Sequence, residues 1–220
     1  MEFSHLFFDL DGTLINSKRG IFNSVKYTMD KLEIPENERP KNLNPFIGPP
    51  LRKSFMNLFG MTADEAENAT KLYREYYKVK GVYDFDIYPG IPEVIKNLKD
   101  TGFSISLVTS KAEEYAKLIL DSTSFAYCFD TVSGCEIDGK RSEKSELISY
   151  TLSKLNLHPN REVLMVGDRY HDIRGAKAIG ISSAAVLYGY GTREELHSED
   201  PDLFLEHPDS LLQLKLTGNR

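Results

Sequence analysis

Cysteine is scarce in this 220-residue chain, and its 27 basic residues are outnumbered by 33 acidic ones. Cys128 and Cys135 are its only cysteines, and two cysteines fit neither a disulfide framework nor a zinc-binding pattern. We therefore expect reduced thiols and a cytoplasmic protein. The formal net charge of −6 gives the surface no general attraction for nucleic acid or for an anionic membrane, so neither is expected as a partner.

Long apolar runs are missing as well. None approaches the about 20 residues that a membrane-spanning helix needs. The first expected strand begins almost directly after Met1, which we expect to leave no room for a signal peptide. With 40% hydrophobic and 27% charged residues, the composition is ordinary for a globular protein that buries a substantial core in one large domain or two small ones.

The most informative stretch is residues 5–14, His-Leu-Phe-Phe-Asp-Leu-Asp-Gly-Thr-Leu. It begins with a short apolar run of the length that a buried strand has. Asp9 and Asp11 follow, and their spacing of two places both side chains on one side of an extended chain. Gly12 then allows the backbone to turn sharply. Carboxylates at the carboxyl end of a buried strand stand where open α/β sheets place their chemistry.

Two other interpretations of this stretch concern the acidic pair. A calcium-binding EF-hand loop needs glycine at its sixth position and glutamate at its twelfth. Counted from Asp9, these positions hold Leu14 and Gly20, which excludes that loop. A plain turn, in which Asp9 and Asp11 only cap the backbone, stays open at this point.

Residues 17–86 have the periodicity of helices and contain no expected strand. Thr62 and Glu65 have the spacing of a capping box, which marks the start of one of these helices. The helices are expected over residues 17–32, 51–59 and 62–80. We therefore expect residues 17–86 to be a helical insertion between strands.

Strands and helices alternate from residue 87 onward. Thr192 and Glu195 are expected to form a second capping box. Strands are expected over residues 103–108, 129–132, 163–166, 183–187 and 203–205, and helices around residues 94–101, 113–120, 142–155, 173–179 and 208–216. This alternation predicts an α/β fold with a doubly wound, mostly parallel sheet, built from residues 1–16 and 87–220.

Polar side chains follow three of the expected buried strands, and parallel strands bring such groups to one edge of a sheet. Four carboxylates cannot crowd there as anions, because unit charges about 4 Å apart repel by about 4 kcal/mol at an effective dielectric of 20. A cluster of oxygen ligands selects a hard divalent ion, best Mg²⁺. The groups concerned are Asp9 and Asp11, Thr109 and Ser110, Asp168 with Asp172, and the cation Lys144 at the start of a helix.

In this order, the motifs resemble the four ordered motifs of the haloacid dehalogenase-like hydrolases over residues 9–172. They are Asp9-Leu10-Asp11-Gly12-Thr13, Thr109 or Ser110, Lys144, and Gly167-Asp168-x-x-x-Asp172. The helical insertion and Tyr88-Pro89-Gly90 are similar to the phosphoglycolate phosphatase and β-phosphoglucomutase branch, in which residues 17–86 would be a cap domain. The family often has proline after the lysine, whereas Ser145 stands here, so Lys140 competes with Lys144.

The resemblance implies a mechanism. Asp9 would be the nucleophile that forms an aspartyl phosphate, and Asp11 would be the general acid and base. Thr109 or Ser110 would bind the phosphoryl oxygens. Lys144 and Mg²⁺ would neutralise charge, with Asp9, Asp11, Asp168 and Asp172 as the metal residues. Asp172 would either bind the ion through water or orient Lys144, and both roles stay open.

The same branch implies a small phosphate ester as the partner, either phosphoglycolate or a nucleoside 5′-monophosphate. We expect a monomer or weak homodimer. Arg52 follows the Gly48-Pro49-Pro50 turn and is either a substrate-binding residue or an ordinary solvated helix residue. Lys111 directly follows the phosphate-binding pair, and it either contacts substrate or, as we expect, is a surface lysine at the start of a helix. Residues 188–191 either border the site or form a plain turn.

Two other functions use similar chemistry. A phosphomutase would return the phosphoryl group to a sugar phosphate. A regulator that accepts a phosphoryl group without being an enzyme would also use an aspartate, Mg²⁺ and a lysine. Asp11, two residues after the nucleophile, and a cap both argue against the regulator.

Overall fold

The structure is a computed structural model that describes residues 1–137 and 140–218. The chain divides into two compact units. The first consists of Met1–Asn16 and Ile87–Arg220, and the second of Ser17–Asp86. A cap role for the second unit stays a prediction.

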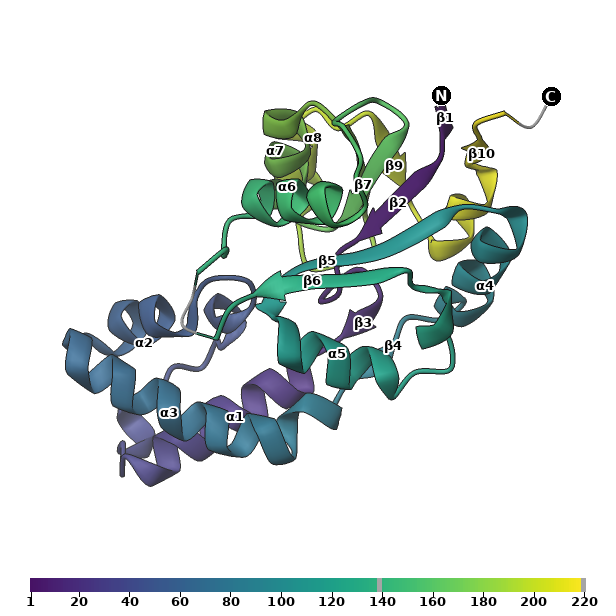
Figure 1. The fold of residues 1–220 in the computed structure, drawn as a ribbon. Coiled ribbons are helices and arrows are strands. Elements are labelled where there is room, and N and C mark those ends of the chain that lie inside the picture. Colours follow the sequence, from purple (N-terminus) through teal and green to yellow (C-terminus); the bar gives the residue numbers. More distant parts are fainter. Residues whose placement is uncertain (138–139, 219–220) are drawn as a thin grey trace. The chain divides into compact units, whose positions relative to one another are not determined.

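The first unit contains a six-stranded sheet with the strand order β6-β5-β2-β7-β8-β9 (Figure 1). All of its neighbouring strands pair in parallel, so the expected α/β fold with a mostly parallel sheet is confirmed. The strands are β2 (His5–Phe8), β5 (Ser104–Ala112), β6 (Thr131–Cys135), β7 (Val163–Gly167), β8 (Ser182–Val186) and β9 (Leu203–Leu205).

Helices cover both faces of this sheet (Figure 1). They are α4 (Ile91–Thr101), α5 (Glu113–Asp121), α6 (Lys144–Lys154), α7 (Tyr170–Ile179) and α8 (Arg193–Ser198). On one face, Leu147 and Ile148 of α6 and Ala176 of α7 pack in one core cluster with Phe7 and Met165 of the sheet. Apolar strands buried on both faces are what a parallel sheet requires.

The end of the chain differs from the expected helix over residues 208–216. A 3₁₀ helix, η5 (Pro208–Gln213), is followed by β10 (Lys215–Leu216), which pairs in parallel with β1 (Glu2–Phe3). Thr217 N donates to the Phe3 carbonyl at 2.9 Å. The helix prediction was wrong because pairing with a distant segment outweighs the local periodicity. Another short 3₁₀ helix, η4, spans Ala126–Cys128.

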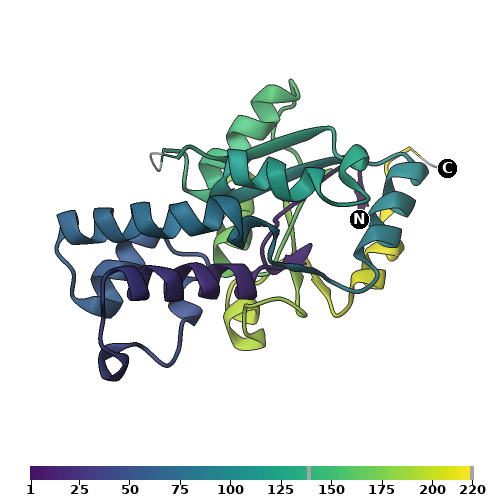
Figure 2. The ribbon, with the colours of Figure 1, turned by 90° about the horizontal axis from the view of Figure 1, so that it is seen from below.

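The second unit is helical, with α1 (Lys18–Lys31), α2 (Leu51–Phe59) and α3 (Ala63–Val79). Helices α1 and α3 lie side by side (Figures 1 and 2), and the rings of Tyr27 and Tyr76 are 5.1 Å apart. The Thr62–Glu65 capping box is confirmed, since each side chain accepts a hydrogen bond from the other residue's backbone N–H. Short 3₁₀ helices are η1 (Glu36–Glu38), η2 (Asn44–Phe46) and η3 (Gly81–Tyr83).

Two further short strands, β3 (Ile15–Asn16) and β4 (Asp86–Ile87), pair with one another. Within residues 1–137 and 140–218, no helix is both long and apolar enough to cross a bilayer.

Candidate active site

Three buried carboxylates come together at the carboxyl ends of β2 and β7. Asp9, Asp168 and Asp172 each have a carboxylate oxygen within 4.8 Å of the others. Strands β2 and β7 are neighbours with Phe8 opposite Val166, and Asp9 N donates to the Val166 carbonyl at 2.9 Å. The aspartates that follow these strands therefore leave the sheet together.

Asp172 lies in the first turn of α7, which begins shortly after β7 ends. Its Oδ2 accepts a hydrogen bond of 3.1 Å from the backbone N–H of Arg169. A carboxylate at a helix N-terminus satisfies backbone N–H groups that have no partner within the helix. The same helix start therefore places Asp172 beside Asp168.

Lys144 is the cation of this cluster. It is the first residue of α6, and its Nζ lies 3.0 Å from Asp9 Oδ1 and 2.7 Å from Asp172 Oδ1. Nζ also donates to the carbonyl of Val108 at 3.0 Å. Lys140, the competing lysine, lies in the turn before α6, where its carbonyl accepts a hydrogen bond from Glu136 N.

Burial and charge shift the pKa values of these groups in different directions. Burial, the largest influence, raises the pKa of Asp9 and raises that of Asp168 well above its ordinary value. Burial acts in the same direction on Asp172, but the Lys144 ammonium outweighs it, and the pKa of Asp172 is lowered. Burial opposes the charge of Lys144, yet Asp172 and Asp9 together raise its pKa.

The three carboxylates fit a divalent cation. With all three ionised, their three negative charges against one ammonium leave a net charge of −2 in a buried place. Asp168 Oδ1 is buried and has no hydrogen-bond partner. A buried anionic oxygen without a partner lowers the stability of the fold, and coordination to a cation would remove this cost. Carboxylate oxygens are the ligands that Mg²⁺ prefers.

Asp11 contacts a lysine other than Lys144. Lys111 Nζ lies 3.0 Å from Asp11 Oδ2, and only 9% of the Lys111 side chain is exposed. The prediction of a surface lysine at the start of a helix was wrong, because β5 continues to Ala112 and carries Lys111 along the strand next to β2. The position of Lys111 directly after Thr109 and Ser110 was the available sequence signal.

Thr109 and Ser110 also lie in β5, near its carboxyl end. The buried Thr109 Oγ1 accepts from Lys111 N at 3.2 Å, and Ser110 Oγ donates to the Ser142 carbonyl at 3.4 Å. Both hydroxyls therefore lie on the strand next to β2, at the edge of the sheet where Asp9 leaves it.

Residues 188–191 border the carboxylate cluster, which was one of the two alternatives left open by the sequence, because Tyr190 N donates to Asp168 Oδ2 at 2.7 Å. Sequence reasoning missed the contact that holds the start of α7. The second expected capping box is only half formed: Thr192 Oγ1 accepts from Glu195 N, but the Glu195 carboxylate accepts instead from Arg169 Nε at 2.9 Å and Tyr170 N at 3.0 Å. A guanidinium and a free helix N-terminus attract this carboxylate more strongly than its own helix does.

Arg52 lies in the first turn of α2 and is exposed. It belongs to the second unit, so a role in binding substrate stays a prediction.

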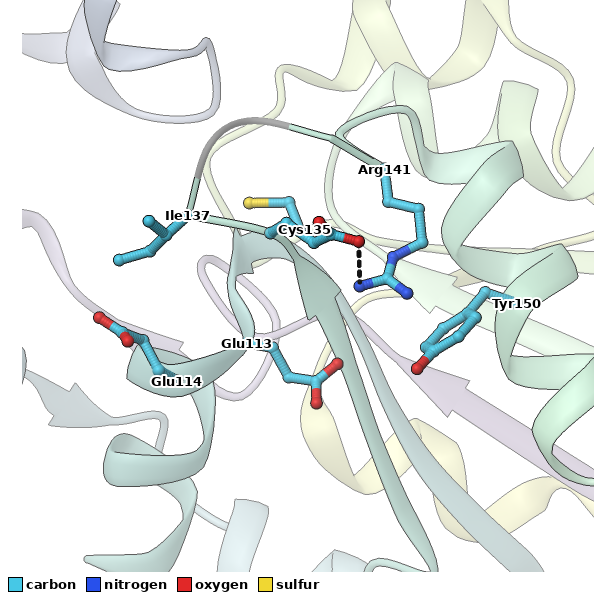
Figure 3. A pocket seen from close by; sticks show the side chains of 7 residues that line it. Glu113, Glu114, Cys135, Ile137, Arg141 and Tyr150 are labelled. Carbon is cyan, nitrogen blue, oxygen red and sulfur yellow. Dashed lines mark ion pairs between the residues drawn. The ribbon is translucent and has the colours of Figure 1, made fainter.

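A pocket of about 260 Å³ adjoins the end of β6 and the start of α5 (Figure 3). Its side chains include Arg141, which faces Glu136 at 3.5 Å and lies 3.9 Å from the centre of the Tyr150 ring. The other lining residues are Glu113, Glu114, Cys135 and Ile137. None of the site residues predicted from the sequence lines this pocket.

Comparisons with known proteins agree with this geometry. Residues 6–186 match the family described as haloacid dehalogenase-like hydrolase. A 5′-nucleotidase from Pseudomonas aeruginosa is 36% identical over 91% of this chain and 90% of its own length. A phosphoglycolate phosphatase from Aquifex aeolicus is 32% identical over 95% of both chains.

A solved structure is similar throughout. It is described as a predicted phosphatase from Clostridium acetobutylicum, and it superposes with a TM-score of 0.87 and 36% identity, covering 96% of this chain and 97% of that one. The chain belongs to the haloacid dehalogenase-like hydrolases, in the phosphoglycolate phosphatase-like branch. The family resemblance noted in the sequence is thereby confirmed, as is the expectation of a hydrolase.

Proposed function

We propose that this protein is a Mg²⁺-dependent phosphatase that hydrolyses a small phosphate monoester through a phosphoryl group carried on Asp9. The observation that supports it best is the buried group of Asp9, Asp168 and Asp172 with Lys144 between two of them. Three clustered carboxylates and a lysine are a poor way to stabilise a fold. They are a suitable way to bring an anionic nucleophile to an anionic phosphate.

Asp9 is the nucleophile in this mechanism. Its carboxylate attacks phosphorus, the bond from phosphorus to the leaving oxygen breaks, and an acyl phosphate forms on Asp9. The Lys144 ammonium, 3.0 Å away, holds the carboxylate in place and opposes the effect of burial, which raises the pKa of Asp9. A carboxylate that approaches a phosphate dianion meets about 8 kcal/mol of repulsion at an effective dielectric of 20, so positive charge is required.

Asp9 and Asp168 would hold the Mg²⁺ ion with the Asp11 carbonyl, and Asp172 would complete the acidic group around it. When bound, the ion would supply two positive charges that neutralise the carboxylates and the phosphoryl oxygens. Asp168 contributes Oδ1, a buried oxygen without a hydrogen-bond partner. Asp172 is paired with Lys144 at 2.7 Å, which favours a role in orienting that lysine.

Asp11 is the general acid and then the general base. It gives a proton to the leaving alcohol, and later takes a proton from the water that attacks the acyl phosphate and regenerates Asp9. Lys111 contacts Asp11 Oδ2 at 3.0 Å and limits where this carboxyl group can point. Thr109 or Ser110 would donate hydrogen bonds to the phosphoryl oxygens from the neighbouring strand.

The names of two relatives and the proposed cap role of the second unit support a small phosphate ester as the substrate. Two relatives have names for different activities on phosphate esters, a 5′-nucleotidase and a phosphoglycolate phosphatase. Residues 17–86 would act as a cap that excludes bulk water during phosphoryl transfer, and Arg52 in that unit would bind the non-reacting part of the substrate. Phosphoglycolate and nucleoside 5′-monophosphates are therefore the first substrates to test.

The test is phosphate release from a panel of small phosphate esters with Mg²⁺ and with EDTA. Asp9→Asn is expected to lower kcat by about 10³-fold or more. Asp200→Asn is the matched control, because Asp200 is fully exposed, in a left-handed conformation that asparagine accepts. Full turnover by Asp9→Asn would exclude the proposed nucleophile. An isomeric sugar phosphate, formed without release of phosphate, would identify a mutase instead.

A further inference from the structure

The segment Tyr188–Gly191, which follows β8, contacts two separate parts of the active site. The Tyr188 hydroxyl donates to the carbonyl of Thr13 at 3.1 Å, and the Tyr190 hydroxyl donates to Asn16 Oδ1 at 3.2 Å. Tyr190 N donates to Asp168 Oδ2 at 2.7 Å. The segment therefore connects the chain that follows Asp9 and Asp11 with the carboxylate of Asp168.

Two glycines allow this segment to lie directly against Asp168. A Cβ atom on Gly189 would come within 2.3 Å of Asp168 Cβ and 2.4 Å of the Gly12 carbonyl oxygen. A Cβ atom on Gly191 would come within 2.1 Å of the Asp168 carbonyl oxygen. Neither glycine has a left-handed φ, so close approach, and not backbone conformation, requires glycine at both positions.

The hydrogen bond from Tyr190 N sets the orientation of the Asp168 carboxylate. Because the backbone N–H of Tyr190 occupies Oδ2, Oδ1 is left buried with no hydrogen-bond partner. Asp168 also has a carboxylate oxygen within 4.8 Å of those of Asp9 and Asp172. A buried carboxylate oxygen without a donor is unfavourable as an anion, and a cation bound at that oxygen removes the penalty.

The chain beyond this segment is also anchored. Glu195 accepts hydrogen bonds from Arg169 Nε at 2.9 Å and from Tyr170 N at 3.0 Å. Both donors directly follow Asp168 in the chain. The segment and Glu195 thus hold Asp168 on one side through its carboxylate and on the other through the residues after it.

We propose that Tyr188–Gly191 is the positioning segment of the metal ligand Asp168, and that its close contact sets the affinity of the protein for a divalent cation. The proposal rests on the proposed function, since it takes Asp168 as a ligand. Residues that orient a metal ligand change metal affinity about 10- to 100-fold when they are altered. Gly189, Gly191 and the Tyr190 N–H would orient Asp168 through their contacts with its carboxylate and backbone.

The test is a titration with Mn²⁺ followed by electron paramagnetic resonance, which measures binding without substrate or turnover. Gly189→Ala and Gly191→Ala are expected to weaken Mn²⁺ binding about 10- to 100-fold. Tyr188→Phe removes one hydroxyl at the edge of the segment and is expected to weaken binding about threefold. This conservative variant decides the question if the alanine variants do not fold.

Gly180→Ala is the matched control. Gly180 ends α7 with a φ of 82°, and a Cβ atom there would meet nothing within 4 Å. The substitution is strained and lowers the midpoint of thermal unfolding, but it touches nothing near Asp168, so Mn²⁺ affinity is expected to equal that of the wild type. Midpoints measured without metal for all variants separate a loss of stability from a loss of affinity.

The outcomes distinguish the two proposals. Wild-type affinity in Gly189→Ala, Gly191→Ala and Tyr188→Phe would overturn the positioning role and leave the proposed metal site intact. An equal loss of affinity in Gly180→Ala would also overturn it, because the loss would then follow general stability. A wild-type protein that binds no Mn²⁺ would overturn the metal site and the positioning role together.

Discussion

Lys144 Nζ lies 2.7 Å from Asp172 Oδ1 at a place where only 1% of either side chain is exposed. The same ammonium is 3.0 Å from Asp9, so one lysine serves two carboxylates of the proposed metal site. Burial alone would raise the pKa of Asp172, and the ammonium instead lowers it. The pair therefore keeps Asp172 ionised, and Asp172 in turn holds Lys144 beside the proposed nucleophile.

Lys144→Met is expected to destabilise the protein and abolish turnover. It leaves buried carboxylates without their cation, a change that costs about 3 to 5 kcal/mol for a buried ion pair. Urea unfolding at pH 7.5 without metal measures the free energy of unfolding. Lys53→Met, at an exposed position of α2, is the control and should be neutral. Unchanged stability of Lys144→Met would show that the ion pairs contribute nothing to the fold.

Asp168→Asn is expected to stabilise the metal-free protein and to abolish its response to Mg²⁺. Burial raises the pKa of Asp168 well above its ordinary value, so the ionised form opposes folding. Asparagine keeps an oxygen for the Tyr190 N–H. A gain of about 0.5 to 2 kcal/mol is expected at pH 8, measured by calorimetry in EDTA and again in Mg²⁺. A destabilised variant, or one that Mg²⁺ still stabilises as much as the wild type, would contradict the assignment.

Stabilisation by Mg²⁺ is expected to increase with pH. A carboxyl group with a raised pKa in the folded state binds protons more tightly there than in the unfolded chain. Its contribution to stability is therefore lost as the pH rises from the pKa of the unfolded chain through the pKa of the folded state. Raised pKa values at Asp9 and Asp168 thus weaken the metal-free protein at higher pH, and bound Mg²⁺ removes this effect.

The measurement is the shift in unfolding midpoint caused by saturating Mg²⁺, compared at pH 5 and pH 7.5. The larger shift belongs to pH 7.5. Asp172 has a lowered pKa, so its contribution to stability has the opposite sign. That contribution is present above the ordinary pKa of an aspartate and is lost as the pH falls below it. The loss lies below pH 5 and does not affect this comparison. A larger shift at pH 5 would contradict the raised values.

Asp11→Asn is expected to separate the two chemical steps. An alkoxide leaving group needs a proton, whereas p-nitrophenolate does not, so the first step should fall by about 10²- to 10⁴-fold only for alkyl phosphates. Because Asp11 is also the base for hydrolysis, p-nitrophenyl phosphate should give a burst of about one product per enzyme. Rapid-quench kinetics measure the burst, and labelled phosphate that stays on the protein measures the acyl phosphate.

The Asp9→Asn variant is the control and should carry no labelled phosphate. Steady turnover of Asp11→Asn without a burst would exclude Asp11 as the base of the second step.

Local sequence determined the strands and helices in most of the chain, and the order of the site motifs. The apolar run before Asp9, the buried strand before Asp168 and the Thr62–Glu65 capping box depend only on side chains close together in the sequence. Parallel strands share a direction, so the meeting of Asp9 and Asp168 at one sheet edge was also predictable. The sequence favoured Lys144 over Lys140 as the cation of the site, because Lys144 lies at the start of an expected helix.

Tertiary structure alone decided the contacts between distant segments. Lys111 reaches Asp11 because β5 extends past its expected end. Tyr190 reaches Asp168 because two glycines allow backbone to pass where a Cβ atom would collide. The Glu195 carboxylate accepts a hydrogen bond from Arg169 and does not complete the capping box of its own helix. Lys215 and Leu216 pair with β1 where a helix was expected. Such contacts depend on which surfaces meet after the sheet has formed, and the periodicity within one segment does not predict them.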